Sequence, residues 1–205
     1  MMGDTVYDVF PRCAWYNIRH LGISHERRLA SKRENVQSLC KRNSIVALSE
    51  LHNSPGVCQA EFVDHISNVH AYYMQGGGDH VILLAEQIRN AHDVQHVELV
   101  SGSSHCITWM QGDVRFVFVA FRFHPHDARI RAQQLRDLKV AVRNLCGGSL
   151  ESVRLVMGGD RNFVTAEDQK QSSSTSEWHP GGARQTICLL SLSSCAGEGG
   201  NWKAN

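Results

Sequence analysis

The chain has 205 residues, of which 42% are hydrophobic and 20% are charged, and its net charge is +1. These are ordinary proportions for a globular domain, so they exclude collagen-like, coiled-coil and wholly disordered chains. The balance of 21 basic and 20 acidic residues argues against binding to nucleic acid through bulk charge alone, although a local basic groove is compatible with it.

The first predicted elements are a strand, a long helix, a second strand and a second helix. Residues 12–19 read as a strand, and Ser24 can cap a helix that runs to about Asn43. The apolar run 45–48 predicts a strand that is buried on both faces. The apolar residues between Phe62 and Tyr73 have helical spacing, which predicts a helix there.

Strand patterns then follow one another closely until a second long helix. The strands are predicted at residues 80–85, 94–100, 105–110 and 114–123. Asp127 can cap the helix, whose apolar stripe starts at Ile130 and which ends at Gly147. A last short strand, 153–157, runs into a Gly-Gly-Asp-Arg-Asn segment. Alternation of strands and helices predicts an α/β or α+β domain.

The composition changes near residue 168. Residues 169–176 are polar and rich in serine, as linkers are, and Gly-rich sequence follows. We therefore divide the chain into a domain over residues 1–168 and a serine- and glycine-rich linker with an atypical tail over residues 169–205.

The cysteines and the first residues of the sequence indicate in which cellular compartment we expect the protein. The seven cysteines are odd in number and form no Cys-x-x-Cys pair, so we expect reduced core thiols and neither a disulfide framework nor a zinc knuckle. The first residues, which include Asp4 and Asp8, lack a signal-peptide pattern, and no apolar run approaches the ~20 residues of a membrane span. We expect an intracellular protein, in the nucleus or the cytoplasm.

Polar side chains recur where the predicted strands end. Asn17 lies in the first strand, Glu50 follows the strand at 45–48, and Asp160 and Asn162 follow the last strand. Side chains at strand ends project into the loop layer, where sites form, and their oxygens suit Mg²⁺. The alternative is that Glu50 and Asp160 are solvated loop residues.

Three motifs, in this order, resemble those of the endonuclease/exonuclease/phosphatase superfamily over residues 12–164. The first is a strand that carries asparagine, Trp-Tyr-Asn-Ile-Arg at 15–19. The second is an apolar strand that ends in glutamate, Ile-Val-Ala-Leu-Ser-Glu-Leu-His at 45–52. The third is Gly-Asp-Arg-Asn at 159–162, after another apolar strand. The superfamily includes deoxyribonucleases, abasic-site endonucleases, retrotransposon endonucleases, inositol polyphosphate phosphatases and sphingomyelinases.

The resemblance implies a four-layer αββα sandwich, here lacking its last strands. It also implies that Glu50 binds the catalytic Mg²⁺, for which Mn²⁺ can substitute, with help from Asn17. Asp160 would orient or deprotonate the attacking water, and Asn162 would contact the phosphate and the nucleophile. Such a site activates water and places positive charge on the phosphate oxygens.

The sequence departs from the family pattern in two places. The strand at 114–123 brings Arg122, with His124 two residues on, to the position where a histidine or tyrosine is expected to approach the phosphate. Arginine binds phosphate well but does not exchange protons at neutral pH. The second departure is the absence of the family's closing Ser-Asp-His segment.

We therefore carry two main hypotheses for function. The first is a Mg²⁺-dependent phosphodiester hydrolase of the DNA endonuclease type, of mobile-element descent, with DNA as its partner and no obligate protein partner. The second is a catalytically inactive remnant of such a domain. An inositol-phosphate or sphingomyelin phosphodiesterase or phosphatase is a third. The excess of basic residues over 24–43 suits either a phosphate-backbone contact or a solvated outer helix face.

Overall fold

The computed structural model describes residues 10–75, 79–147, 153–160 and 186–188. The helices within these residues are α1 (Glu26–Arg42), α2 (Pro55–Glu61), the 3₁₀ turn η1 (Val63–His65), α3 (Glu86–Ala91) and α4 (Ala128–Leu145). None of these helices is long and apolar enough to cross a membrane.

The described strands form two sheets. The first has the order β1-β2-β4-β3 and contains β1 (Cys13–Asn17), β2 (Ile45–Ser49), β3 (Val69–Tyr73) and β4 (His80–Ala85). The second has the order β5-β6-β7-β8-β9 and contains β5 (Gln95–Val100), β6 (Ser104–Gln111), β7 (Val114–Arg122), β8 (Val153–Asp160) and β9 (Thr186–Cys188). Strand β9, which lies within the predicted tail, pairs with β8.

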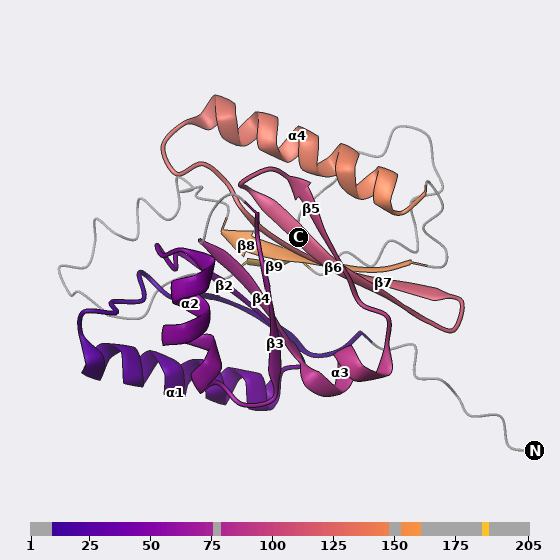
Figure 1. The fold of residues 1–205 in the computed structure, drawn as a ribbon. Helices are drawn as coiled ribbons and strands as arrows, with labels where there is room; N and C mark the ends of the chain where they lie inside the picture. Colours follow the sequence, from indigo (N-terminus) through magenta and orange to yellow (C-terminus); the bar gives the residue numbers. More distant parts are fainter. Residues whose placement is uncertain (1–9, 76–78, 148–152, 161–185, 189–205) are drawn as a thin grey trace, which may run out of the picture.

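The elements are arranged in four layers, as Figure 1 shows. Helix α4 covers the second sheet, α1 and α2 lie on the outside of the first, and the sheets face each other between them. The predicted αββα sandwich is therefore confirmed.

This packing arises because successive side chains of a strand point to opposite faces of its sheet. On β7, Phe116, Phe118 and Ala120 face the core between the sheets, whereas Val117 and Val119 face α4. The predicted strand at 45–48 is also confirmed, because β2 is buried at every position.

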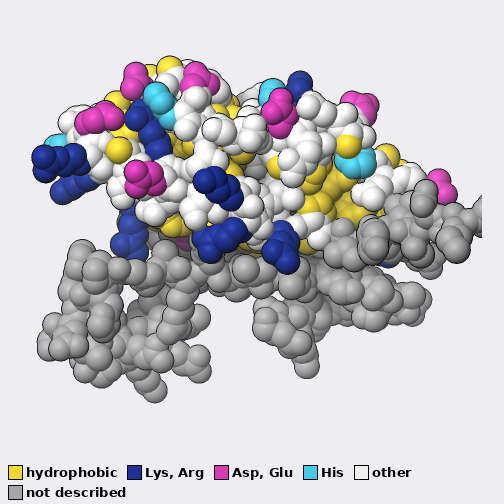
Figure 2. Space-filling model, turned by 90° about the horizontal axis from the view of Figure 1, so that it is seen from below, with side chains coloured by type: hydrophobic (Ala, Val, Ile, Leu, Met, Phe, Trp, Pro, Cys, Tyr) yellow, Lys and Arg dark blue, Asp and Glu magenta, His cyan; other side chains and the backbone are white. Residues whose placement is uncertain are grey.

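The two long helices bury one stripe each. Helix α1 packs Leu29 and Val36 onto the first sheet, and α4 packs Leu138 and Val142 onto the second. On the face seen from below in Figure 2, basic and acidic side chains are interspersed, as on a solvated surface. Two basic residues of α1 are used internally: Lys32 donates to the backbone carbonyl of His20, and Arg33 Nε donates to that of Glu61 at 3.0 Å.

The structure corrects three details of the sequence analysis. The predicted helix over 62–73 is wrong, because Pro55 and the Ser54 cap start α2 earlier and the chain then returns as the edge strand β3. Helix α1 starts after His25 without a side-chain cap, so Ser24 does not cap it. Ile130 is an exposed residue of α4 rather than part of its buried stripe.

Two other expectations hold. Asp127 caps α4 and accepts hydrogen bonds from the backbone N–H groups of Arg129 and Ile130, at 2.8 and 3.2 Å. The five cysteines whose side chains the structure describes are free thiols; Cys58, Cys106 and Cys146 are buried, and burial raises the pKa of Cys106 to about 12.

Candidate functional site

Polar residues collect at one rim of the space between the sheets. The inward faces of β1, β4 and β7 carry apolar or small residues and reach this rim at Asn17, His80 and Arg122. The inward face of β8 carries Val156 and Gly158 and reaches the rim at Asp160. Parallel pairing places Asn17 beside Ser49, the last residue of β2, and Arg122 beside Asp160. The backbone register therefore brings three of the predicted site residues to strand ends.

Arg122 joins the two sheets at this rim. Its Nη1 lies 2.6 Å from Asp79 Oδ2, and its Nη2 lies 3.8 Å from Glu50 Oε1. Glu50 and Asp79 belong to the first sheet's loops, whereas Arg122 ends β7 of the second sheet. These contacts place Glu50 and the Arg122–Asp160 pair at the same rim.

Asp79 is a rim residue that the sequence analysis missed. Its Oδ1 accepts the backbone N–H of His52 at 3.0 Å and lies 3.3 Å from His52 Nδ1. The sequence does carry a signal for Asp79. This carboxylate directly precedes the buried strand β4, just as Glu50 directly follows the buried strand β2.

The loop that carries Glu50 has an unusual backbone. Glu50 has a φ of 61° and His52 a φ of 52°, and in the adjoining loop Arg19 and His20 also adopt the left-handed conformation. The two loops are tied together, since the His20 N–H donates to the Glu50 carbonyl at 2.7 Å. Left-handed non-glycine residues are costly and cluster at functional sites.

Glycines allow Asp160 to lie close to the other strands. A Cβ at Gly158 would lie 2.2 Å from the indole of Trp15, and a Cβ at Gly159 would lie 1.9 Å from the Phe121 carbonyl oxygen. The Asp160 carbonyl accepts the Phe123 N–H at 2.9 Å, which extends the pairing of β7 and β8 beyond the strands. The predicted site residue Asn162 lies outside the described residues.

His124 has a different setting from Arg122. The His124 Nδ1 accepts hydrogen bonds from the backbone N–H groups of His126 and Asp127, at 3.3 and 3.0 Å. The backbone N–H of His124 donates to Gln134 Oε1 at 2.8 Å. The side chain therefore shapes the turn into α4. Its predicted contact with phosphate stays a prediction.

The rim is acidic around a single bridging guanidinium. Glu50, Asp79 and Asp160 supply three carboxylates, and Arg122 contacts the first two. His80 adds no positive charge, because burial and the nearby Arg122 lower its pKa to about 4. The excess of carboxylates favours a cation at this rim.

The donor atoms fit a hard cation that keeps most of its water. Among the described residues, no group of three or more His, Cys, Asp or Glu side chains is placed to hold a metal ion. Mg²⁺ needs no such cage, since one or two carboxylates and several waters suffice. Glu50 and Asn17 offer oxygen donors; the Asn17 Oδ1 also accepts the Arg19 N–H at 2.9 Å, which fixes its orientation.

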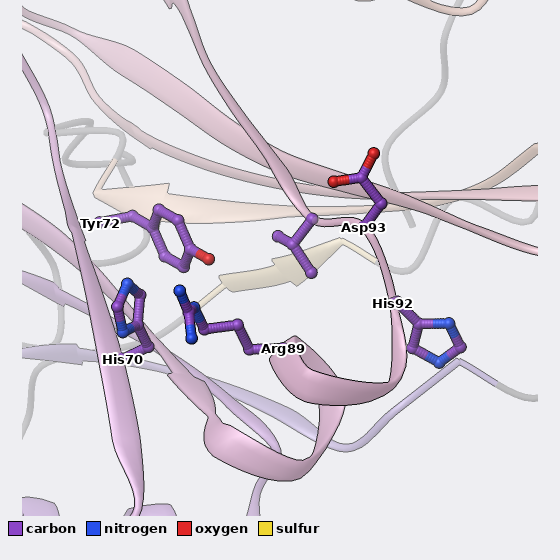
Figure 3. Close-up of a pocket in the computed structure, with 6 residues that line it drawn as sticks. His70, Tyr72, Arg89, His92 and Asp93 are labelled. Atoms are coloured by element: carbon purple, nitrogen blue, oxygen red, sulfur yellow. The ribbon is translucent and has the colours of Figure 1, made fainter.

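A separate pocket of about 380 Å³ lies at the far end of the sheets. Its lining residues are His70, Tyr72, Arg89, His92, Asp93 and Val94. Figure 3 shows the Arg89 guanidinium beside the rings of His70 and Tyr72, while His92 and Asp93 lie apart from them. Burial and Arg89 lower the pKa of His70. None of the predicted site residues lines this pocket.

No family model and no curated protein matches the sequence, but solved structures match its fold. The endonuclease domain of TRAS1, a telomere-specific non-LTR retrotransposon, matches at a TM-score of 0.50 and 14% identity, over 80% of this chain and 70% of that domain. TDP2 from C. elegans matches at 0.55 and 18% identity, over 78% of this chain and 50% of that one.

The catalytic domain of human Nocturnin also matches, at a TM-score of 0.56 and 14% identity, over 81% of this chain and 69% of that one. These proteins are all members of the endonuclease/exonuclease/phosphatase superfamily. The chain spans only half the length of the TDP2 structure. At these identities the matches establish the fold that the three motifs predicted.

Proposed function

We propose that this chain, which has the endonuclease/exonuclease/phosphatase fold, is a Mg²⁺-dependent phosphodiester hydrolase that acts on DNA. The observation that carries the proposal is the Arg122 bridge to Asp79 and Glu50 of the first sheet's loops, together with the strand pairing that puts Asp160 beside Arg122. Metal-dependent phosphodiester hydrolysis can use a metal-binding carboxylate, a carboxylate for the water and a cationic donor for phosphate, and the residue types at this rim suit these three roles.

Each residue takes the part that its chemistry allows. Glu50 and Asn17 hold the metal ion, which when bound draws charge from the phosphate oxygens. Asp160 accepts a proton from the attacking water, and Asn162 donates to a phosphate oxygen. Arg122 has five N–H donors, so its contacts with Asp79 and Glu50 leave donors for the phosphate.

DNA is the substrate class best supported by the surroundings of the rim. Arg19, Arg27 and Arg28 are exposed in the loop after β1 and the first turn of α1, where they suit flanking phosphates. The matched TRAS1 domain is an endonuclease by its description. Local rather than overall positive charge agrees with the net charge of +1.

The test is nicking of a supercoiled plasmid, with Mg²⁺ and with EDTA, by the wild type and by Glu50→Gln. We expect EDTA to abolish nicking and Glu50→Gln to reduce its rate on the order of 10²-fold. Glu34→Gln, which alters an exposed carboxylate of α1, is the matched control and should leave the rate unchanged.

Two outcomes contradict the proposal. EDTA-sensitive nicking that persists in Glu50→Gln overturns the assignment of Glu50 as metal ligand. No nicking by a folded wild type overturns the enzymatic function and favours the inactive remnant.

A further inference from the structure

His80 is the most completely buried histidine at the candidate site. It is the first residue of β4, it is 2% exposed, and it pairs with Ser49 at the end of β2. Its side chain lies on the face of β4 that also carries Ile82 and Leu84, so it points into the space between the sheets. It therefore sits just inside the rim, adjacent in sequence to Asp79.

Several polar atoms around His80 have no partner among the described residues. They are both ring nitrogens of His80, the Nε2 of His105 and the Nε of Arg122, all fully buried. The rings of His80 and His105 lie 5.9 Å apart, and His105 Nδ1 is occupied by His96 Nε2 at 3.0 Å. Buried polar atoms in folded proteins are nearly always hydrogen-bonded, and an ordered water is the usual partner where protein groups are out of reach.

The strand neighbours of the two histidines are small residues. Ser49 pairs with His80, and Ala120 pairs with His105. The donors and acceptors are also complementary. Arg122 Nε is a donor, and a neutral imidazole has one acceptor nitrogen. His80 is neutral because burial and Arg122 lower its pKa to about 4.

We propose that His80 is a positioning residue, which accepts a hydrogen bond from Arg122 Nε through one buried water and so fixes the direction of the guanidinium. Asp79 holds the outer end of the same guanidinium through Nη1 at 2.6 Å. Held at Nε and at Nη1, Arg122 presents its remaining donors in one orientation at the rim. This inference rests on the proposed function, because the orientation matters for the scissile phosphate.

The consequence is a defect in substrate binding that a retained acceptor can repair. His80→Leu removes the acceptor for the buried water and for Arg122 Nε, so it should raise KM for the plasmid about 10-fold. It should also lower the free energy of unfolding, because a buried donor is left without its partner. His80→Gln, which keeps a hydrogen-bond acceptor, should bring KM most of the way back to the wild-type value.

The experiment measures kcat and KM for plasmid nicking, and urea unfolding, for wild type, His80→Leu, His80→Gln, Arg122→Gln and the double variant His80→Leu/Arg122→Gln. Because His80 acts through Arg122, adding His80→Leu to Arg122→Gln should not raise KM further. His70→Leu, at the far end of the first sheet, is the control and should leave KM unchanged. If His80→Leu does not fold, His80→Met carries the same comparison.

The outcomes separate this inference from the proposed function. Nicking by the wild type with an unchanged KM in His80→Leu overturns the positioning role alone. An equal rise of KM in His80→Gln and His80→Leu also overturns it. So does a full further rise of KM when His80→Leu is added to Arg122→Gln. No nicking by a folded wild type overturns the proposed function and this inference with it.

Discussion

Arg122 is the residue on which the candidate site depends. It is 19% exposed and reaches Asp79 at 2.6 Å and Glu50 at 3.8 Å, so it neutralises two carboxylates that come from different loops. Arginine at this position cannot act as an acid or base at neutral pH, but its planar fork suits two carboxylates and a phosphate together. Its role is thus structural and electrostatic at once.

The coupling between Arg122 and Asp79 can be measured. Arg122→Gln and Asp79→Asn should each lower the free energy of unfolding by about 1–3 kcal/mol, because each leaves a partly buried charge without its partner. The double variant should lose less than the sum, with a coupling energy of about 0.5–3 kcal/mol by urea denaturation.

The Arg33–Glu26 pair on α1 provides the control for this cycle. Its atoms lie 3.3 Å apart, but the Glu26 side chain is 76% exposed, so its coupling should stay below about 1 kcal/mol. Equal coupling energies for the Arg122–Asp79 and Arg33–Glu26 pairs would contradict the expectation that the Arg122–Asp79 ion pair contributes more to stability.

At the scale of elements, the caps and close contacts of the second sheet decide where the site residues lie. Helix α4 starts at a cap formed by Asp127, directly after the turn shaped by His124. Strand β8 passes so close to Trp15 and Phe121 that glycine alone fits at two successive positions. Both features hold the carboxyl ends of β7 and β8 in place.

Loss of the α4 cap should be visible in thermal unfolding. Asp127→Ala removes the acceptor for the N–H groups of Arg129 and Ile130 and should cost about 1 kcal/mol. For a chain of this length that is a fall in Tm of about 2–4 °C by differential scanning calorimetry. Asp137→Ala, in the middle of the same helix, should change Tm by less; an equal fall would mean that the Asp127 cap contributes little.

Gly158 should be the more sensitive position. Gly158→Ala places a Cβ 2.2 Å from the rigid Trp15 indole, so the strand or the ring must shift, at about 1–3 kcal/mol of unfolding free energy. Gly56→Ala in α2 meets nothing within 4 Å and serves as the matched control. Urea denaturation in which both substitutions are tolerated alike would contradict the close packing of β8 on β1.

At the scale of the whole molecule, the two sheets bury titratable groups in their shared core. His80 and His105 lie between the sheets, and burial is the largest cause of the lowered pKa of each. In the unfolded chain both rings are solvated and regain ordinary titration near 6.5. The unfolded state therefore binds protons more readily than the folded state.

This difference predicts a loss of stability in mild acid. The folded pKa of His80 is about 4, so its contribution is fully present above about pH 6.5 and is lost as the pH falls toward 4. His80 alone should lower the unfolding free energy by about 3 kcal/mol over that range. Urea denaturation from pH 7.5 to 4.5 should show a steeper fall for wild type than for His80→Leu; parallel curves would contradict buried, neutral His80.

Much of the architecture followed from sequence pattern. The apolar runs at β2, β4 and β7 and the Asp127 cap predicted elements of an α/β or α+β domain, because strand burial and capping are local properties. The αββα sandwich was implied by the resemblance that the three motifs carry. The region from Phe62 to Tyr73 was predicted as a helix and is a short turn followed by an edge strand. There, pairing with β4 outweighed a helical spacing of apolar residues.

The sequence by itself determined which polar residues lie in or just after the apolar strand runs, namely Asn17, Glu50, Arg122 and Asp160. The tertiary structure alone decided that these ends meet, and that Asp79 and His80 join them. An ion pair such as Arg122–Asp79 spans 43 residues and two sheets, so no local pattern encodes it. It arises because two sheets packed face to face bring their strand ends to a common rim.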